Sequence, residues 1–275
     1  MKVIAPPAGT PLVISSDAVW PALPFQTDAT GSHTWNWDVA WKGFTASGVA
    51  QTPTNQWDAA ATVTNYGGTV TVKAQAGADS ATLSVVIKGT NPTADELMKF
   101  LSTKPNGSGF AKILVHESHC RNFGATGEPL KSFDNGYGMC QLTTPKPAYA
   151  DVWNWKKNVE AGLILFAAKR ASAQTYLKQA GRTFTDDQLL YETVCRWNGG
   201  RYHEWDAKAG KWVRPATLLC DSLTGNIGWD LTDAANTGKT EAELHKRDAP
   251  SYSKPPAAGA HWRYSGVCYA DAILR

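Results

Sequence analysis

The chain lacks any apolar run long enough to span a membrane, and its first residues do not resemble a secretory signal. Spanning a bilayer takes about 20 consecutive apolar residues, and no stretch approaches that length. At the start of the chain, Pro6 and Pro7 interrupt the apolar residues before they reach the length of a secretory signal. We therefore expect a soluble protein without an evident signal peptide, which is delivered or secreted by another route or has already lost a leader.

An excess of charge of one sign is also missing. Lys and Arg number 27 against 24 Asp and Glu, which gives a formal net charge of +3. A net charge this small argues against a nucleic-acid partner, although a positive charge would help the protein to approach an anionic cell wall. The 12 Trp and nine Tyr are numerous, and aromatic rings serve either in a core or as surfaces on which sugar rings stack.

Cysteine and histidine are few. The five cysteines are an odd number, so at least one is unpaired within the chain. Disulfides among Cys120, Cys140 and Cys195, or between Cys220 and Cys268, are one option in an oxidising compartment, and buried free thiols are the other. His116 and His119 stand three residues apart, whereas zinc peptidases of the His-Glu-x-x-His type need a spacing of four. We expect no metal and no cofactor, and a zinc peptidase or amidase stays as a rival interpretation.

The sequence pattern of residues 1–90 is typical of β structure. The segments 11–15, 69–74 and 81–87 are rich in β-branched residues and are separated by Gly, Asn and Asp turn signals. Short strands at this spacing predict a small β-sandwich, and the pattern resembles bacterial immunoglobulin-like domains. The resemblance implies a binding or docking module over residues 1–90.

Residues 91–275 are predicted to be mainly helical. Thr93 with Glu96, and Thr185 with Gln188, have the spacing of capping boxes at helix starts. Helices are further predicted over 110–120 and 155–180, because apolar residues recur there with helical spacing. The predicted fold class is thus a multi-domain chain, an N-terminal β-sandwich followed by a mainly α domain.

Three short motifs in the helical region indicate the chemistry. His116-Glu117-Ser118-His119 closes an apolar helix, Gly136-Tyr137-Gly138-Met139-Cys140-Gln141 forms a glycine-rich turn, and Trp197-Asn198-Gly199-Gly200 follows a helix. In this order they resemble the lytic transglycosylase and goose-type lysozyme superfamily, over about residues 93–200. The resemblance implies a lysozyme-like catalytic domain over residues 91–275 that cleaves the β-1,4 bond between N-acetylmuramic acid and N-acetylglucosamine.

The resemblance also implies residue roles. Glu117 would be the general acid, because a Glu that leaves an apolar helix for a cleft loses hydration, which disfavours its charged form. The expected substrate-binding residues are Ser118, Tyr137, Gly138, Met139, Gln141, Trp197 and Asn198. Ser118 would mainly stabilise the helix end. Trp197 stands where the family usually has Tyr, and its indole N–H donates but cannot accept.

The reaction product depends on a second carboxylate. Direct hydrolysis typically needs one, whereas a lytic transglycosylase uses the 6-hydroxyl of muramic acid and gives an anhydro product. Asp134 is the candidate for this catalytic role, and Glu128 is another. Thr143 and Thr144 occupy a further position at which goose-type lysozymes offer an aspartate. Hydrolysis by a muramidase is preferred, with transglycosylation as the alternative.

The expected partner is the glycan strand of peptidoglycan in the bacterial periplasm. A wall-cleaving enzyme without a signal would suit an antibacterial effector of a type VI secretion apparatus, or a phage lysin. An immunity protein, or a secretion or phage carrier, would then be a further partner. The rival from another class is a non-catalytic protein that binds the wall or serves as structure.

Overall fold

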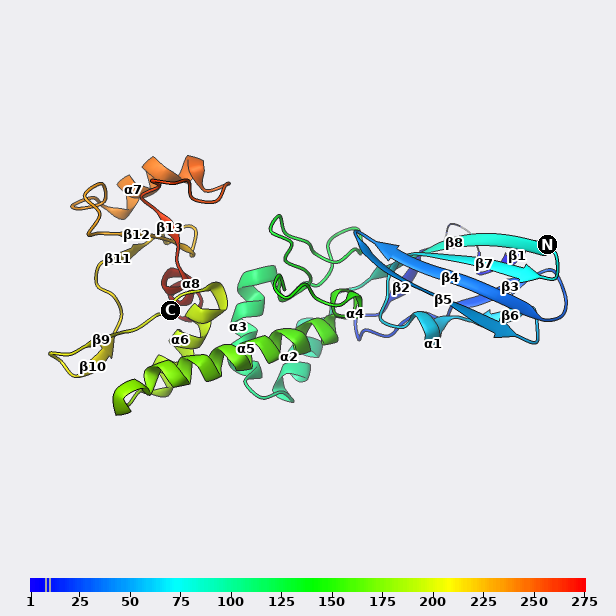
Figure 1. Cartoon of the computed structure of the whole chain (residues 1–275), viewed down its shortest axis with the longest axis horizontal. Helices are drawn as coiled ribbons and strands as arrows, with labels where there is room; N and C mark the ends of the chain where they lie inside the picture. The colour runs from blue at the N-terminus through cyan, green and yellow to red at the C-terminus, as the bar shows by residue number, and fades with distance from the viewer. Residues whose placement is uncertain (8, 10) are drawn as a thin grey trace. The chain divides into compact units, whose positions relative to one another are not determined.

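The structure is a computed structural model that describes residues 1–7, 9 and 11–275. The chain forms two compact units, Met1–Gly162 and Leu163–Arg275, which we describe one at a time (Figure 1). None of the helices in the described part of the chain combines the length and the apolar character that crossing a membrane requires.

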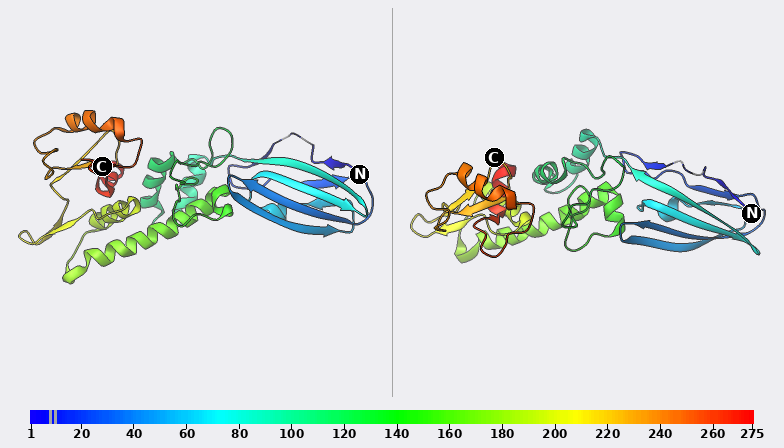
Figure 2. Two further views of the ribbon diagram at one scale, coloured as in Figure 1. Left: turned by 45° about the horizontal axis from the view of Figure 1, so that its top comes forward. Right: turned by 90° about the horizontal axis from the view of Figure 1, so that it is seen from above.

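A five-stranded sheet dominates the first unit. Its order is β2-β8-β7-β4-β5, with β2 parallel to β8 and the other pairs antiparallel. Figure 2 shows the long strands side by side in two views. Tight turns at Lys42-Gly43 and Gly77-Ala78 join the hairpins, since Trp41 pairs with Phe44 and Ala76 with Asp79. The strands are β2 (Leu12–Ile14), β4 (His33–Trp41), β5 (Phe44–Thr52), β7 (Gly68–Ala76) and β8 (Asp79–Gly89).

A second, three-stranded sheet contributes to the same core. It contains β1 (Val3–Ala5), β3 (Pro24–Thr27) and β6 (Gln56–Asp58) in the order β1-β3-β6, and the short helix α1 (Ala60–Val63) follows. Alternate side chains of both sheets point inward, as a strand that is buried on one face requires. The ring of Trp57 lies 5.9 Å from that of Phe25 and 6.0 Å from that of Trp35, which joins the two sheets in one aromatic core.

Helices complete the first unit. These are α2 (Ala94–Ser102), α3 (Gly107–Ser118), α4 (Tyr149–Trp153) and the start of α5 (Trp155–Leu177). The predicted capping box is confirmed, because Thr93 Oγ1 accepts the N–H of Glu96 and Glu96 accepts the N–H of Thr93. The side chains of Tyr149 and Trp153 belong to the aromatic core of the sheets, where Tyr149 stacks on Phe44 and Trp153 meets Trp41 edge-on.

The second unit mixes helices with short strands. It contains the end of α5, then α6 (Asp186–Asn198), α7 (Glu241–Asp248), α8 (Gly266–Leu274) and the 3-10 turns η1 (Gln179–Gly181) and η2 (Ala249–Ser251). Its sheets are β9-β10 and β11-β12-β13. Their strands are β9 (Glu204–Asp206), β10 (Lys211–Val213), β11 (Leu218–Cys220), β12 (Ile227–Asp230) and β13 (Arg263–Tyr264).

The predicted fold class is wrong. The chain has mixed content, 33% helix and 26% strand, in several small open sheets. Five of the strands lie beyond residue 200, so the region after residue 90 is not mainly α. The strands before residue 90 do not form a self-contained sandwich either, because Phe123, Tyr137 and Trp153 complete their core. The predicted domain boundary between residues 90 and 91, with the functions assigned to each side, stays a prediction.

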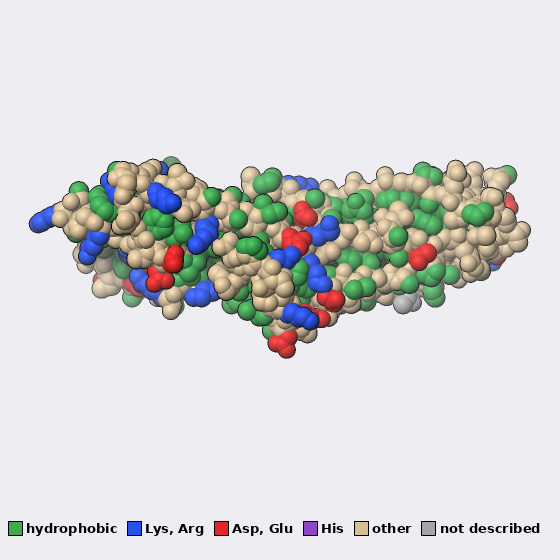
Figure 3. All heavy atoms as spheres, turned by 90° about the horizontal axis from the view of Figure 1, so that it is seen from below, with side chains coloured by type: hydrophobic (Ala, Val, Ile, Leu, Met, Phe, Trp, Pro, Cys, Tyr) green, Lys and Arg blue, Asp and Glu red, His purple; other side chains and the backbone are tan. Residues whose placement is uncertain are grey.

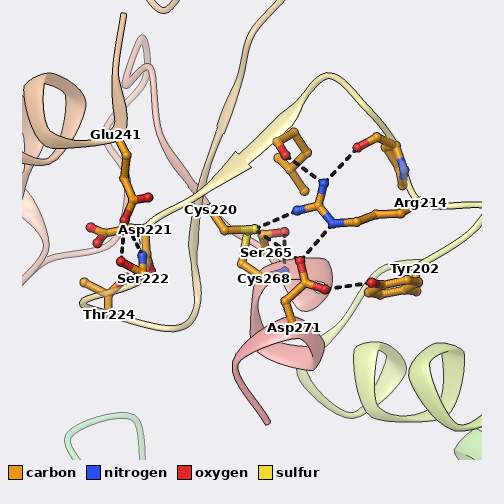
Figure 4. Close-up of a disulfide and its surroundings, with 12 residues drawn as sticks. Tyr202, Arg214, Cys220, Asp221, Ser222, Thr224, Glu241, Ser265, Cys268 and Asp271 are labelled. Carbon is orange, nitrogen blue, oxygen red and sulfur yellow. Dashed lines mark hydrogen bonds and ion pairs between the residues drawn. A yellow bond between two sulfur atoms is a disulfide. The ribbon is translucent and has the colours of Figure 1, made fainter. Parts of the chain in front are cut away.

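One disulfide joins Cys220 on β11 to Cys268 on α8 (Figure 4). Cys120, Cys140 and Cys195 are free thiols. Of the two groups left open by the sequence, the C-terminal pair is therefore bonded.

Candidate functional site

Glu117 lies in the last turn of α3. Phe110, Ile113 and Leu114 bury the apolar face of this helix, and His119 ends it in the left-handed conformation, with φ of 52°. Glu117 itself is half-buried. The neighbouring Ser118 is buried, and its hydroxyl donates to the carbonyl of Leu114 at 3.2 Å. This hydrogen bond lies within the last turn of the helix, and both the structural use of Ser118 and its contact with substrate stay predictions.

Two buried asparagines hold the glycine-rich turn from both sides. Asn122 Oδ1 accepts the backbone N–H of Met139 at 3.0 Å, and Asn158 Oδ1 accepts that of Cys140 at 2.8 Å. The amide of Asn158 also donates to the carbonyl of Tyr137 at 3.2 Å. Both asparagine side chains are fully excluded from solvent, so these bonds replace water for the buried backbone of the turn.

Gly138 lies between the two asparagines. Its φ is +70°, a conformation that L side chains rarely adopt. A Cβ at this position would stand 2.4 Å from Asn158 Nδ2 and 2.7 Å from Asn122 Oδ1. The close approach of the two amides therefore requires glycine here.

Helix α3 and the glycine-rich turn meet at Gly162 of α5, where a Cβ would stand 2.7 Å from the ring of Phe110 and 2.6 Å from Cys140 Sγ. Burial raises the pKa of the Cys140 thiol well above its ordinary value, and the negative charge of Glu117 raises it further. The end of α3 and the glycine-rich turn are far apart in sequence, yet the charge of one acts on the buried side chain of the other. The structure thus brings together the first two motifs that the sequence singled out.

The residues of the turn that were predicted to contact substrate differ in their exposure to solvent. Gly138 is buried, Met139 is fully buried, and Tyr137 packs edge-on against Phe44 at 5.2 Å between ring centroids. The side chains of Tyr137 and Met139 are therefore part of the core. Gln141 is half-buried with φ of 48°, and its Nε2 donates to the carbonyl of Gly138 at 2.7 Å. A substrate contact of these residues stays a prediction.

The two candidates for a second carboxylate have different surroundings. Asp134 is exposed and accepts a hydrogen bond from the hydroxyl of Ser132, which also accepts the N–H of Gly136. Glu128 pairs with Lys42 at 2.7 Å, and this hydrogen bond holds the pKa of Glu128 below its usual value. The contacts of Asp134 are therefore those of a turn residue. A catalytic role for Asp134 or Glu128 stays a prediction.

Trp197 and Asn198, from the third motif, are the last residues of α6 in the second unit. Trp197 is half-buried, and Asn198 is exposed. The confirmed capping box of Thr185 and Gln188 starts this helix.

Glu192 organises the chain beyond α6 and was missed by sequence reasoning. Its fully buried carboxylate accepts hydrogen bonds from Arg196 Nε at 3.0 Å and from the backbone N–H groups of Tyr202 at 2.9 Å and His203 at 3.0 Å. A buried charge needs such partners. Glu192 therefore holds the segment that follows Asn198 against α6.

The described residues contain no group of three or more His, Cys, Asp or Glu side chains that could hold a metal ion. Basic and acidic side chains are interspersed on the face drawn in Figure 3. When the chain is compared with known proteins, no family model, curated protein or solved structure matches it.

Proposed function

We propose that the protein is a peptidoglycan glycosidase of the muramidase kind, with Glu117 as its general acid. The observation that supports this most is the position of Glu117, half-buried at the end of α3 and close enough to the glycine-rich turn for its charge to act on Cys140. Protonating the leaving oxygen of a glycosidic bond needs such a carboxyl group, positioned on a rigid element. The buried hydrogen bonds of Asn122 and Asn158 supply that rigidity to the turn.

Hydrolysis is the preferred reaction and lytic transglycosylation the alternative. Hydrolysis would use Asp134, which is exposed near the turn. Transglycosylation would need no second carboxylate, because the substrate's own hydroxyl attacks. In either case the partner is the glycan strand, met in the periplasm after delivery as an antibacterial effector or a phage lysin.

The test is digestion of purified peptidoglycan, with the released muropeptides read by mass spectrometry. Glu117→Gln keeps the shape of the side chain and removes its ionisable proton, so we expect activity to fall by about 100-fold or more. Glu160→Gln is the matched control, because Glu160 is a partly exposed carboxylate of the same unit, paired with Lys104 at the surface.

The products separate the alternatives. Reducing muramic ends indicate a muramidase, and ends lighter by one water indicate a lytic transglycosylase. Equal cleavage by wild type and Glu117→Gln would exclude Glu117 as the acid. No cleavage of any wall type by the wild type would favour a wall-binding or structural protein instead.

A further inference from the structure

We infer that a pocket beside Asn198 binds the carboxylate groups of the peptide stems of peptidoglycan. The pocket lies within the second unit and has a volume of about 500 Å³. Three segments line it: the turn after α6, the stretch before β11, and β13 with the start of α8. The identity of the ligand rests on the proposed function, whereas the chemistry of the pocket does not.

The charged side chains of the pocket are all basic. Arg201 and Arg263 line it, and its lining in the described part of the chain includes no Asp or Glu. Both arginines are exposed, and Arg263 forms no ion pair among the described residues. The guanidinium of Arg201 lies over the ring of Tyr176, 4.7 Å from its centroid. Arg201 also forms a side-chain hydrogen bond with Tyr176, which anchors one end of its guanidinium group beside the pocket, and a guanidinium has five N–H donors, so others remain for a carboxylate.

Neutral donors accompany the two arginines. The exposed Asn198 makes no side-chain hydrogen bond among the described residues. At the start of α8, the hydroxyl of Ser265 accepts the N–H of Cys268 at 3.3 Å. The N–H groups of Gly266 and Val267 belong to the first turn and have no partner within the helix. Cationic and neutral donors together match an anionic ligand with two oxygens.

A hydrogen-bond chain holds the walls of the pocket in place. Glu192 fixes the backbone of Tyr202, whose hydroxyl donates to Asp271 on α8 at 2.6 Å. Arg214 Nε donates to the other oxygen of Asp271 at 2.8 Å, and Arg214 Nη1 donates to the carbonyl of Leu218 at 2.9 Å. Figure 4 shows Arg214 and Tyr202 each bonded to the carboxylate of Asp271, beside the disulfide. All three lining segments are therefore tied together before a ligand arrives.

The turn and the helix start also touch directly. A Cβ at Gly266 would stand 2.0 Å from the carbonyl oxygen of Gly199, so the two backbones meet where a side chain would not fit. This contact closes one side of the pocket with backbone alone.

The charge of the pocket selects among the parts of peptidoglycan. The sugars of a glycan strand are neutral at their hydroxyl and N-acetyl groups, and two arginines add little to their binding. The stem peptides carry free carboxylates, which arginine binds through paired, charge-assisted hydrogen bonds. The stem is therefore the part of the substrate that this pocket recognises.

The test is calorimetric binding to the intact chain carrying Glu117→Gln, so that no substrate is consumed. The probes are a muramyl tripeptide with free carboxylates, the same compound with its carboxylates amidated, and chitotetraose. Arg201→Gln and Arg263→Gln are compared with Arg170→Gln, a control arginine on α5 outside the pocket lining. We expect each pocket variant to weaken binding of the acidic probe by about tenfold, and added salt to weaken it as well.

The result has separate consequences for the pocket and for the activity. Equal affinity for the acidic and amidated probes, or equal affinity of the Arg201→Gln and Arg170→Gln proteins, would overturn the inference while leaving glycan cleavage untouched. Charge-dependent binding by a protein whose wild type cleaves no glycan would instead support the pocket and remove the proposed activity.

Discussion

Asn158 Oδ1 accepts the backbone N–H of Cys140 at 2.8 Å, from a side chain that is fully buried. Asn158→Ala removes this acceptor and also the donor to Tyr137. A buried backbone N–H left without a partner is costly, so we expect the free energy of unfolding to fall by about 2–4 kcal/mol. Chemical denaturation measures this change. Gln174→Ala, an exposed change on the same helix, is the control, and equal midpoints for the two variants would contradict the role of Asn158.

Thiol labelling tests the cysteine arrangement. Burial raises the pKa of Cys120, Cys140 and Cys195, but Cys120 alone of the three is partly exposed. We expect iodoacetamide near pH 8 to modify Cys120 first, and the other two only on unfolding. Cys220 and Cys268 should react only after reduction. Peptide mapping reads the sites, and labelling of Cys220 in the unreduced protein would contradict the bond.

Reduction of the disulfide should destabilise the second unit. The bond closes a loop with a sequence separation of 48, for which chain entropy gives about 4 kcal/mol. We expect a reductant to lower the melting temperature by on the order of 10 °C, measured by calorimetry. The double variant Cys220→Ser with Cys268→Ser should melt at the lower temperature with or without reductant. If the reductant lowered the melting temperature of this double variant further, the destabilisation would not come from loss of the disulfide.

Acid should weaken the packing of α7. Burial alone would raise the pKa of Asp248, but hydrogen bonds from Arg247 and Trp229 outweigh it and lower the pKa below its usual value. The stabilisation is therefore present above the unfolded value of about 3.9, and is lost as the pH falls through the lower folded value.

Melting curves between pH 2 and pH 7 follow this loss. Asp248→Asn should melt below the wild type at neutral pH, with the difference shrinking toward pH 2. Glu204→Gln removes an exposed carboxylate of the same unit and should show no comparable trend. A difference for Asp248→Asn that is constant over the range would argue against an ionic contribution.

Short-range patterns were predictable from the sequence. The capping boxes of Thr93 and Thr185 span four residues each, so a short stretch of sequence contains all that these helix starts require. The predicted strand segments 69–74 and 81–87 lie inside β7 and β8. The strands β9 to β13 were missed because they have two to four residues each, too few for an alternating pattern to be recognised.

The site was only partly predictable, for a different reason. The order of the motifs led to Glu117 and the turn around Gly138, whose proximity the structure supports. It assigned no role to Asn122, Asn158 or Glu192, although Asn158 lies in the segment 155–162 that resembles a helix of the same superfamily. A polar residue in a sequence is expected to be exposed, and the burial of these three depends on backbone groups up to 30 residues away.

The packing of Tyr137 has a consequence for how the chain can be cut. Its ring packs edge-on against Trp41 and Phe44 of the five-stranded sheet, and Tyr149 stacks on the same Phe44. A fragment that began at residue 91 would present these tyrosines to water and leave the neighbouring glycine-rich turn without its support. The strands are thus an internal scaffold of the turn, and we expect truncation at that position to remove the packing that holds the turn in place.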